Sequence, residues 1–201
     1  MGGYAGTVPS DTTGAPHDER SDETERWQVV SRFVEIRSPW LSLIGERLRD
    51  REGRDLDHWR VEKPDSLVVV TIQDGRFVLP RRSFRPGVGR STLDFPGGRI
   101  EHTGSLAEDG AAIVRREFGL GAADPFASNE PLNTEGWDVD SSSSSQRLYG
   151  MVAELSRAVT IDEPNLGASY PATVAGAREL LRDLVCVQCR AVLAAWMERQ
   201  A

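Results

Sequence analysis

A short apolar run, SLVVVTI at residues 66–72, restricts the fold of this chain more than any other segment. A run of about four to eight such residues is typical of a strand buried on both faces. Asp74-Gly75 then signals a hairpin turn, and RFVLPRRSF at residues 76–84 predicts the partner strand. Since a strand buried on both faces needs a layer on each side, we predict an α/β sandwich with a mixed sheet.

Two different segments precede this run. Residues 1–25 are rich in Gly, Pro, Ser, Thr and acidic residues, and they predict a disordered tail because they offer almost nothing to bury. From Trp27 onward, β-branched and aromatic residues predict three strands, at residues 27–37, 38–50 and 55–63. We therefore expect an N-terminal β meander at residues 26–63 and a main domain at residues 64–201.

The remaining signals complete the main domain. RSTLDF at residues 90–95 predicts a strand that Pro96-Gly97-Gly98 ends. A helix is expected over residues 105–118, with Ser105 as its N-cap and Gly119 as its C-terminal stop. Later segments predict a flexible serine loop, a strand and one or two closing helices, at residues 141–146, 147–155 and 171–200.

The two cysteines of the chain, Cys186 and Cys189, are spaced as CVQC within the last helical segment. One CxxC without a second Cys or His pair is a weak metal signal. We therefore predict that both are small apolar residues on a buried helix face.

Charge and hydropathy exclude two classes of partner. The net charge of −7 argues against a general nucleic-acid binder, whose phosphate contacts require a basic surface. No apolar run reaches about 18 residues, so we expect no membrane-spanning segment. The first residues lack the pattern of a secretory signal, and a cytoplasmic protein is the resulting expectation.

The order of the parts resembles the Nudix superfamily, and within it the ADP-ribose pyrophosphatase-like branch. The resemblance covers nearly all of residues 27–199. It rests on the meander ending in WRVEKPD, the hairpin VVVTIQDGRFVL, the segment SFRPGVGRSTLDFPGGRIE and a helix ending in REFGL. It implies a Nudix-type α/β/α sandwich and hydrolysis of a nucleoside diphosphate linked to a sugar or a related group. In that branch the N-terminal strands often form a dimer, so a homodimer is expected.

The characteristic Nudix box aligns without gaps from Gly98 to Leu120, but it is degenerate. Of its four glutamates only Glu117 remains. The positions of the other three, and of the box arginine, are occupied by Gly104, Ala112, Ile113 and Arg116. Positions 112, 113, 116 and 117 share one helix face, which binds Mg²⁺ in the family.

The resemblance implies a set of site residues. Glu117 and Glu101 would be catalytic and, with the Gly98 carbonyl, would hold Mg²⁺ or Mn²⁺. Substrate binding is expected from Arg85, Arg99, Arg116 and Asp94. Arg116 places a fixed positive charge where a metal-binding carboxylate belongs. It could either neutralise phosphate in place of the metal or pair with Glu117 and close the site.

Two readings of the function follow. In the first the protein is a divergent hydrolase, as the preserved Gly-Gly turn, Arg85 and Glu117 favour. GDP-mannose mannosyl hydrolases, a Nudix branch, also carry an aliphatic residue at the position of Ile113. A variant of this first reading is a Nudix-fold enzyme reused in specialised biosynthesis, where the reaction need not be hydrolysis. In the second reading the protein is a catalytically silent Nudix fold that binds a nucleotide as a sensor, as the degenerate box favours.

Overall fold

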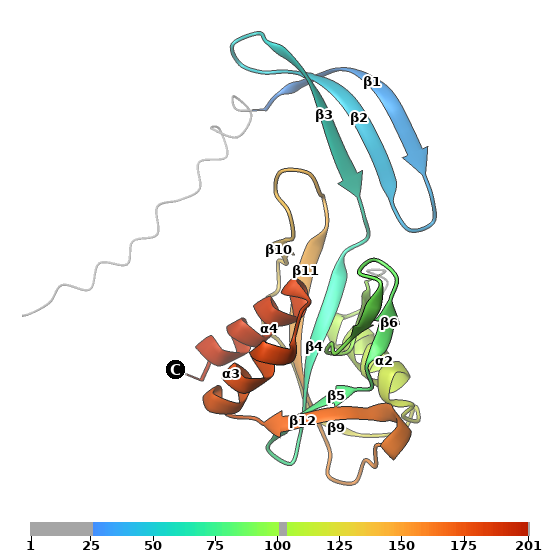
Figure 1. The fold of residues 1–201 in the computed structure, drawn as a ribbon, viewed down its shortest axis with the longest axis vertical. Coiled ribbons are helices and arrows are strands. Elements are labelled where there is room, and N and C mark those ends of the chain that lie inside the picture. The colour runs from blue at the N-terminus through green and yellow to red at the C-terminus, as the bar shows by residue number, and fades with distance from the viewer. Residues whose placement is uncertain (1–25, 101–103, 201) are drawn as a thin grey trace, which may run out of the picture.

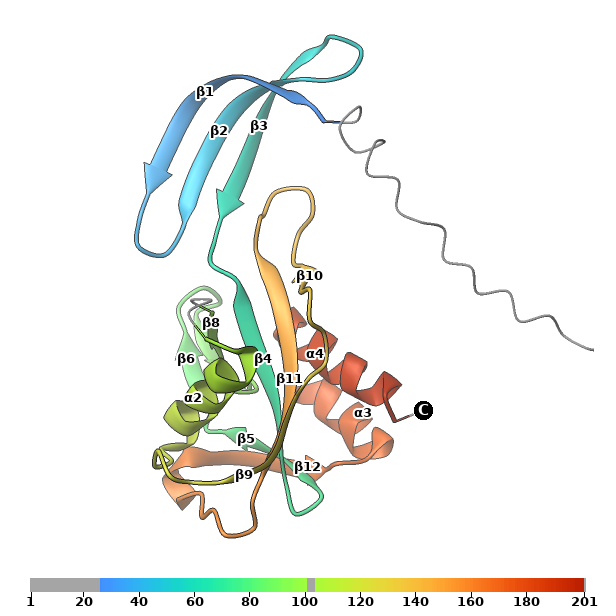
Figure 2. The same ribbon diagram turned by 180° about the vertical axis from the view of Figure 1, so that it is seen from behind.

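The computed structural model describes residues 26–100 and 104–200 (Figure 1). The predicted tail at residues 1–25 therefore lies outside the described residues, as does Glu101. The described chain forms a separate three-stranded sheet and a larger sheet with helices on both faces, as Figures 1 and 2 show from opposite sides. The predicted α/β fold with an N-terminal meander is confirmed.

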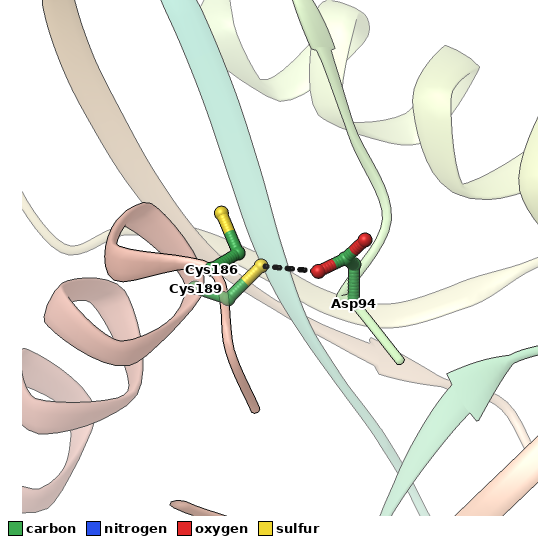
Figure 3. Close-up of side chains that lie close together, drawn as sticks. All are labelled: Asp94, Cys186 and Cys189. Carbon is green, nitrogen blue, oxygen red and sulfur yellow. Dashed lines mark hydrogen bonds between the residues drawn. The ribbon is translucent and has the colours of Figure 1, made fainter. Parts of the chain in front are cut away.

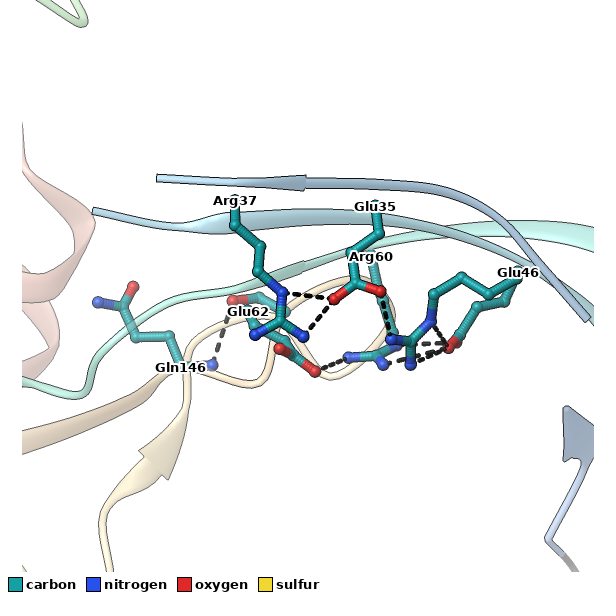
Figure 4. Close-up of polar contacts among 8 residues, drawn as sticks. Glu35, Arg37, Glu46, Arg60, Glu62 and Gln146 are labelled. Carbon is teal, nitrogen blue, oxygen red and sulfur yellow. Dashed lines mark hydrogen bonds and ion pairs between the residues drawn. The ribbon is translucent and has the colours of Figure 1, made fainter. Parts of the chain in front are cut away.

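The N-terminal meander consists of β1 (Gln28–Arg37), β2 (Ser42–Arg49) and β3 (Asp55–Glu62), all antiparallel and in chain order. Glu46 of β2 links the three strands of the meander, and its side chain is almost fully buried. Glu46 accepts hydrogen bonds of 2.9 Å from Arg60 Nε of β3 and Arg32 Nη2 of β1 (the Arg60 contact is drawn in Figure 4). These two guanidinium groups, Arg60 first, lower the pKa of Glu46 although burial opposes them.

The larger sheet has the strand order β10-β11-β4-β5-β12, with β8 paired to β4 and β9 paired to β11. Only the β11–β4 pair is parallel, so the sheet is mixed. A two-stranded hairpin, β6–β7, stands beside it. The strands are β4 (Ser66–Gln73), β5 (Arg76–Pro80), β6 (Ser83–Arg85), β7 (Arg90–Thr92), β8 (Gly97–Arg99), β9 (Phe126–Pro131), β10 (Trp137–Asp138), β11 (Arg147–Leu155) and β12 (Leu166–Pro171).

Strand β4 is buried on both faces, as its apolar run predicts. Val68 and Val70 face the cluster formed with α3 (Val174–Asp183) and α4 (Val187–Glu198). Leu67 and Val69 face the opposite cluster, formed with α2 (Leu106–Phe118). The alternation follows from the two-residue period of a strand, and it makes β4 the centre of an α/β/α sandwich.

The predicted helix boundaries are close to those observed. Ser105 caps α2 and forms a capping box with Glu108, whose pKa is lowered by the Ser105 backbone and hydroxyl hydrogen bonds. Gly119 ends α2 in the left-handed conformation, with φ of 67°. Gly110 inside α2 also has a packing reason, because a Cβ there would lie 2.8 Å from Met151 Sδ.

Several local expectations were wrong. Residues 76–84 do not form one strand, because the chain leaves β5 at Pro80 and starts a separate hairpin. The strand expected over residues 90–95 ends at Thr92. The serine run is not a free loop, because Val61 of β3 exchanges backbone hydrogen bonds with Ser143 and Ser145. Strand β8 was missed, because Gly97-Gly98 was expected to end a strand and not to form one. Strands β9, β10 and β12 and the 3₁₀ helix Glu163–Asn165 carried no strong sequence pattern and were missed too. In the described ranges, no helix has the length and apolar character needed to cross a membrane.

Candidate functional site

A cavity of about 520 Å³ lies between β8, the β6–β7 hairpin and the start of α4. The antiparallel pairing of Gly98 with Leu67 of β4 places the Gly-Gly segment along one wall. Four residues singled out in the sequence lie around this cavity: Arg85, Asp94, Gly98 and Arg99. They come from β6, from the segment between β7 and β8, and from β8 itself.

Asp94 and Arg85 contact one another in the cavity wall. Arg85 Nε donates a hydrogen bond of 2.9 Å to Asp94 Oδ2, and the Thr92 hydroxyl donates one of 2.6 Å to the same oxygen. The Asp94 side chain is 10% exposed, whereas that of Arg85 is 50% exposed. Asp94 is thus a fixed carboxylate, and Arg85 keeps part of its guanidinium open to a ligand.

Arg99 reaches from β8 to the meander. Its guanidinium lies 4.2 Å from the centroid of the Trp40 ring, and its Nη1 donates a hydrogen bond of 3.1 Å to the Pro39 carbonyl. Both partners belong to the connection between β1 and β2. The meander therefore orients one of the cations of the cavity.

Cys186 and Cys189 also line this cavity, which the sequence did not predict. Cys189 is buried, as expected, but half-buried Cys186 is the N-cap of α4 and does not lie on a helix face. Figure 3 shows both side chains beside Asp94, with Cys189 Sγ 4.0 Å from Asp94 Oδ1. The spacing CVQC was a visible signal, but nothing in the sequence paired it with a residue more than ninety positions away.

The two thiols differ in acidity. A hydrogen bond from the Cys189 thiol, assisted by the backbone amides of Cys189 and Gln188, lowers the pKa of Cys186 to about 6. Its neighbour Cys186 and burial raise the pKa of Cys189. Cys186 therefore has the larger fraction of thiolate of the two.

Arg116 and Glu117 of α2 lie outside the lining of this cavity. Arg116 Nη2 donates hydrogen bonds of 2.9 Å to the Gly97 carbonyl and 2.8 Å to Glu117 Oε1. Ile113 fills the space next to Gly98, because a Cβ at Gly98 would lie 3.1 Å from its side chain. This face of α2 is therefore used for packing and for one exposed ion pair.

The resemblance implies Mg²⁺ on this face of α2, and the described residues do not fit that ion. Mg²⁺ requires near-octahedral oxygen ligands at about 2.0–2.1 Å. Ala112 and Ile113 offer no oxygen from their side chains, and the carboxylate of Glu117 is already paired with Arg116. Glu101, the second predicted ligand, lies outside the described residues.

The comparisons support the fold. No protein-family model matches the chain, and no curated protein matches it significantly. Among solved structures, the crystal structure of an ADP compounds hydrolase matches with a TM-score of 0.66 and 19% sequence identity. The match covers 88% of this chain and 97% of that one. At this identity the similarity concerns the fold, and the α/β arrangement predicted as Nudix-type is the one found.

Proposed function

We propose that the protein is a Nudix-fold hydrolase of a nucleoside diphosphate linked to a sugar or a related group. The observation that carries the proposal is the arginine-rimmed cavity beside the Gly97-Gly98 strand. Its volume of about 520 Å³ falls within the usual range of small-molecule sites. The fold neighbour hydrolyses ADP compounds, according to its name.

The cavity offers two kinds of wall to such a ligand. Arg85, Arg90 and Arg99 are exposed at its edge and carry the positive charge that a diphosphate needs. Leu67, Val68 and Phe95 form an apolar floor. A nucleoside diphosphate derivative combines the apolar faces of a base with anionic phosphate oxygens. The apolar floor would contact the base, and the arginines would contact the phosphates.

Arg116 is the residue through which the α2 face can still act on phosphate. Its guanidinium bridges the Gly97 carbonyl and Glu117, and it is 59% exposed. The side chain is therefore not sealed in a closed ion pair, and it can turn its remaining N–H groups toward an anion. In this proposal Arg116 supplies charge where the family uses a metal ion.

The test is incubation of the pure protein with a panel of nucleotide-sugars and dinucleotides, with Mg²⁺, Mn²⁺ or a chelator, followed by mass analysis of products. Hydrolysis in ¹⁸O-labelled water shows the bond that breaks, because label enters the phosphate after attack at phosphorus and the sugar after attack at the anomeric carbon. Arg85→Gln and Arg99→Gln should lower turnover. No turnover of any member, together with micromolar binding of one, would sink the hydrolase proposal.

That outcome would favour a second function, a nucleotide-binding or sensor module on the same fold. The observation in its favour is the loss of the metal-binding face, where Ile113 packs on Gly98 and Arg116 takes the Gly97 carbonyl. A binder needs the arginine rim and the apolar floor but no group that activates water. Glu117→Gln separates the two functions, since it should reduce turnover in an enzyme and leave ligand affinity unchanged in a sensor.

Homodimer formation through the meander belongs to the same proposal. The meander, with the residues that precede and connect its strands, exposes many large apolar side chains, which is unusual for a sheet in contact with solvent. They are Trp27, Val29, Val30, Phe33, Ile36, Trp40, Leu41 and Trp59. Large apolar side chains exposed in such numbers are a feature of protein interfaces. Since Trp40 contacts Arg99, a second copy seated on the meander would lie close to the cavity.

A further inference from the structure

Three potential metal ligands meet at the inner end of the cavity. The sulfur atoms of Cys186 and Cys189 and one carboxylate oxygen of Asp94 all lie within 4.8 Å of one another. Figure 3 shows the three side chains close together, two from the start of α4 and one from the segment between β7 and β8, with Cys189 directed at Asp94. This group is separate from the helix face of the Nudix box and shares no residue with it.

The backbone explains the convergence. Leu93 and Leu184, both almost fully buried, form an isolated parallel bridge between segments far apart in the sequence. Asp94 directly follows Leu93, and Cys186 comes two residues after Leu184. The CVQC spacing then places Cys189 in the first turn of α4, next to Cys186.

We propose that Asp94, Cys186 and Cys189 form a site for a thiophilic divalent cation, Zn²⁺, with its fourth coordination position open to the cavity. Two thiolates and a carboxylate are ligands that Zn²⁺ accepts in a tetrahedral site. Three protein ligands and one open position are the arrangement found in catalytic and ligand-binding zinc sites.

The distances suit this ion. With Zn–S bonds of about 2.3 Å and Zn–O bonds of about 2.0–2.2 Å, tetrahedral geometry places the ligand atoms roughly 3.5–3.8 Å apart. The observed separations reach no more than 4.8 Å, and Cys189 Sγ is 4.0 Å from Asp94 Oδ1. The ligand atoms therefore have to approach one another by about 1 Å at most to reach tetrahedral spacing.

The surroundings of Asp94 prepare it for this role. Arg85 and Thr92 both hydrogen-bond to its Oδ2, which leaves Oδ1 directed at the cysteines. Carboxylates that bind metals are commonly held by hydrogen bonds in this way. The Arg85 cation also balances the single negative charge that Zn²⁺ with two thiolates and one carboxylate would carry.

Sulfur ligands decide which ion the site selects. Thiolates favour Zn²⁺ and disfavour Mg²⁺, whose usual ligands are carboxylate, carbonyl and water oxygens. A carboxylate beside the two sulfurs also argues for a cation, because a simple disulfide would gain nothing from it. The inference concerns this chain's own ligand set and does not depend on whether the cavity turns over a nucleotide.

The test uses the full chain, reduced and freed of metal with a chelator that is then removed. Titration with Co²⁺, a spectroscopic substitute for Zn²⁺, should produce thiolate-to-cobalt charge-transfer absorption that saturates at one equivalent. Addition of Zn²⁺ should abolish it, and a large excess of Mg²⁺ should not. Zn²⁺ should also protect both thiols of the unaltered protein from alkylation, a readout that needs no variant.

Variants assign the ligands. Cys186→Ser and Cys189→Ser should each weaken Zn²⁺ binding by more than about tenfold, since loss of even an outer partner of a ligand costs about 10–100-fold. Asp94→Asn should weaken binding, and Asp94→Cys should keep it and strengthen the charge-transfer band. Asp138→Asn, which removes an exposed carboxylate outside the cavity, is the control and should change nothing.

Three results would overturn the proposal. One is the absence of charge-transfer absorption and of thiol protection in the reduced protein. Another is unchanged Co²⁺ binding in a folded variant that lacks both cysteines. The third is rapid formation of a Cys186–Cys189 disulfide in air that Zn²⁺ does not slow, which would identify the pair as a redox couple.

Discussion

The guanidinium of Arg116 lies between two oxygens, 2.9 Å from the Gly97 carbonyl and 2.8 Å from Glu117 Oε1. The cation thus holds together a carbonyl and a carboxylate on the outer face of α2. Its charge is permanent, because an arginine side chain stays protonated in proteins.

Restoring a carboxylate at this position should restore metal binding. Arg116→Glu removes the donor to the Gly97 carbonyl and places a second carboxylate next to that of Glu117. This carbonyl and the two carboxylates are oxygen ligands of the kind that Mg²⁺ binds. We expect millimolar Mg²⁺ to raise the thermal midpoint of this variant and to leave that of the unaltered protein unchanged. Arg116→Gln, which removes the charge without adding a ligand, is the control; a Mg²⁺ response in the control would contradict the interpretation.

The fold and the site differed in how much of them the sequence predicted. The run at residues 66–72 and the caps at Ser105 and Gly119 are local signals, so β4 and α2 were predicted nearly to the residue. The joining of Asp94 to Cys186 and Cys189 depends on the bridge between Leu93 and Leu184, a contact across the chain that no local pattern encodes. The pairing of Arg116 with Glu117 was one of two alternatives that the sequence offered, whereas the hydrogen bond from Arg116 to the Gly97 carbonyl was not predicted.

Acid should destabilise the meander through Glu46. Because its two arginine partners lower the pKa of Glu46 from an ordinary value of 4.5, its stabilising contribution is complete above that value. The contribution is lost as the pH falls through the lower, folded-state pKa. Glu46→Gln should reduce stability at pH 7, by about 1–3 kcal/mol, and should flatten the fall in thermal midpoint on acidification.

The comparison for Glu46→Gln is Glu52→Gln, an exposed carboxylate in the β2–β3 connection. It should leave the thermal midpoint and its pH profile nearly unchanged. An acid profile of Glu46→Gln that parallels that of the unaltered protein would show that other carboxylates dominate.

Trp40 should influence ligand affinity although it lies on the meander. Its ring holds Arg99 in place, and an exposed cation–π contact is worth about 0.5–1 kcal/mol. Trp40→Leu should therefore weaken binding of ADP, measured by calorimetry, by roughly two- to fivefold. Arg99→Gln should weaken it by about tenfold or more, because a charged hydrogen bond to phosphate is lost. Trp27→Leu, at the residue directly before β1, is the matched control, and an equal loss there would indicate a general effect on the meander.

Gly119 should be sensitive to a single methyl group. Its φ of 67° is a left-handed conformation, and a Cβ there would also lie 2.8 Å from Asn165 Nδ2. Gly119→Ala should lower the free energy of unfolding by about 1–2 kcal/mol, measured by urea denaturation. Gly121→Ala, two residues later, meets only an ordinary contact at 3.4 Å and should be nearly neutral. Equal effects of the two substitutions would contradict the conformational explanation.

The exposed apolar residues of the meander give the last prediction. Ile36 is 59% exposed on β1, and Val29 is 58% exposed on the same strand. If these side chains lie in a dimer interface, burying a new carboxylate there without a partner costs several kcal/mol. Ile36→Asp and Val29→Asp should each convert the dimer to a monomer in sedimentation analysis, with the thermal midpoint falling as the dimer is lost. Val139→Asp, an equally apolar exposed position outside the meander, should remain dimeric. A monomeric mass for the unaltered protein at working concentration would refute the dimer.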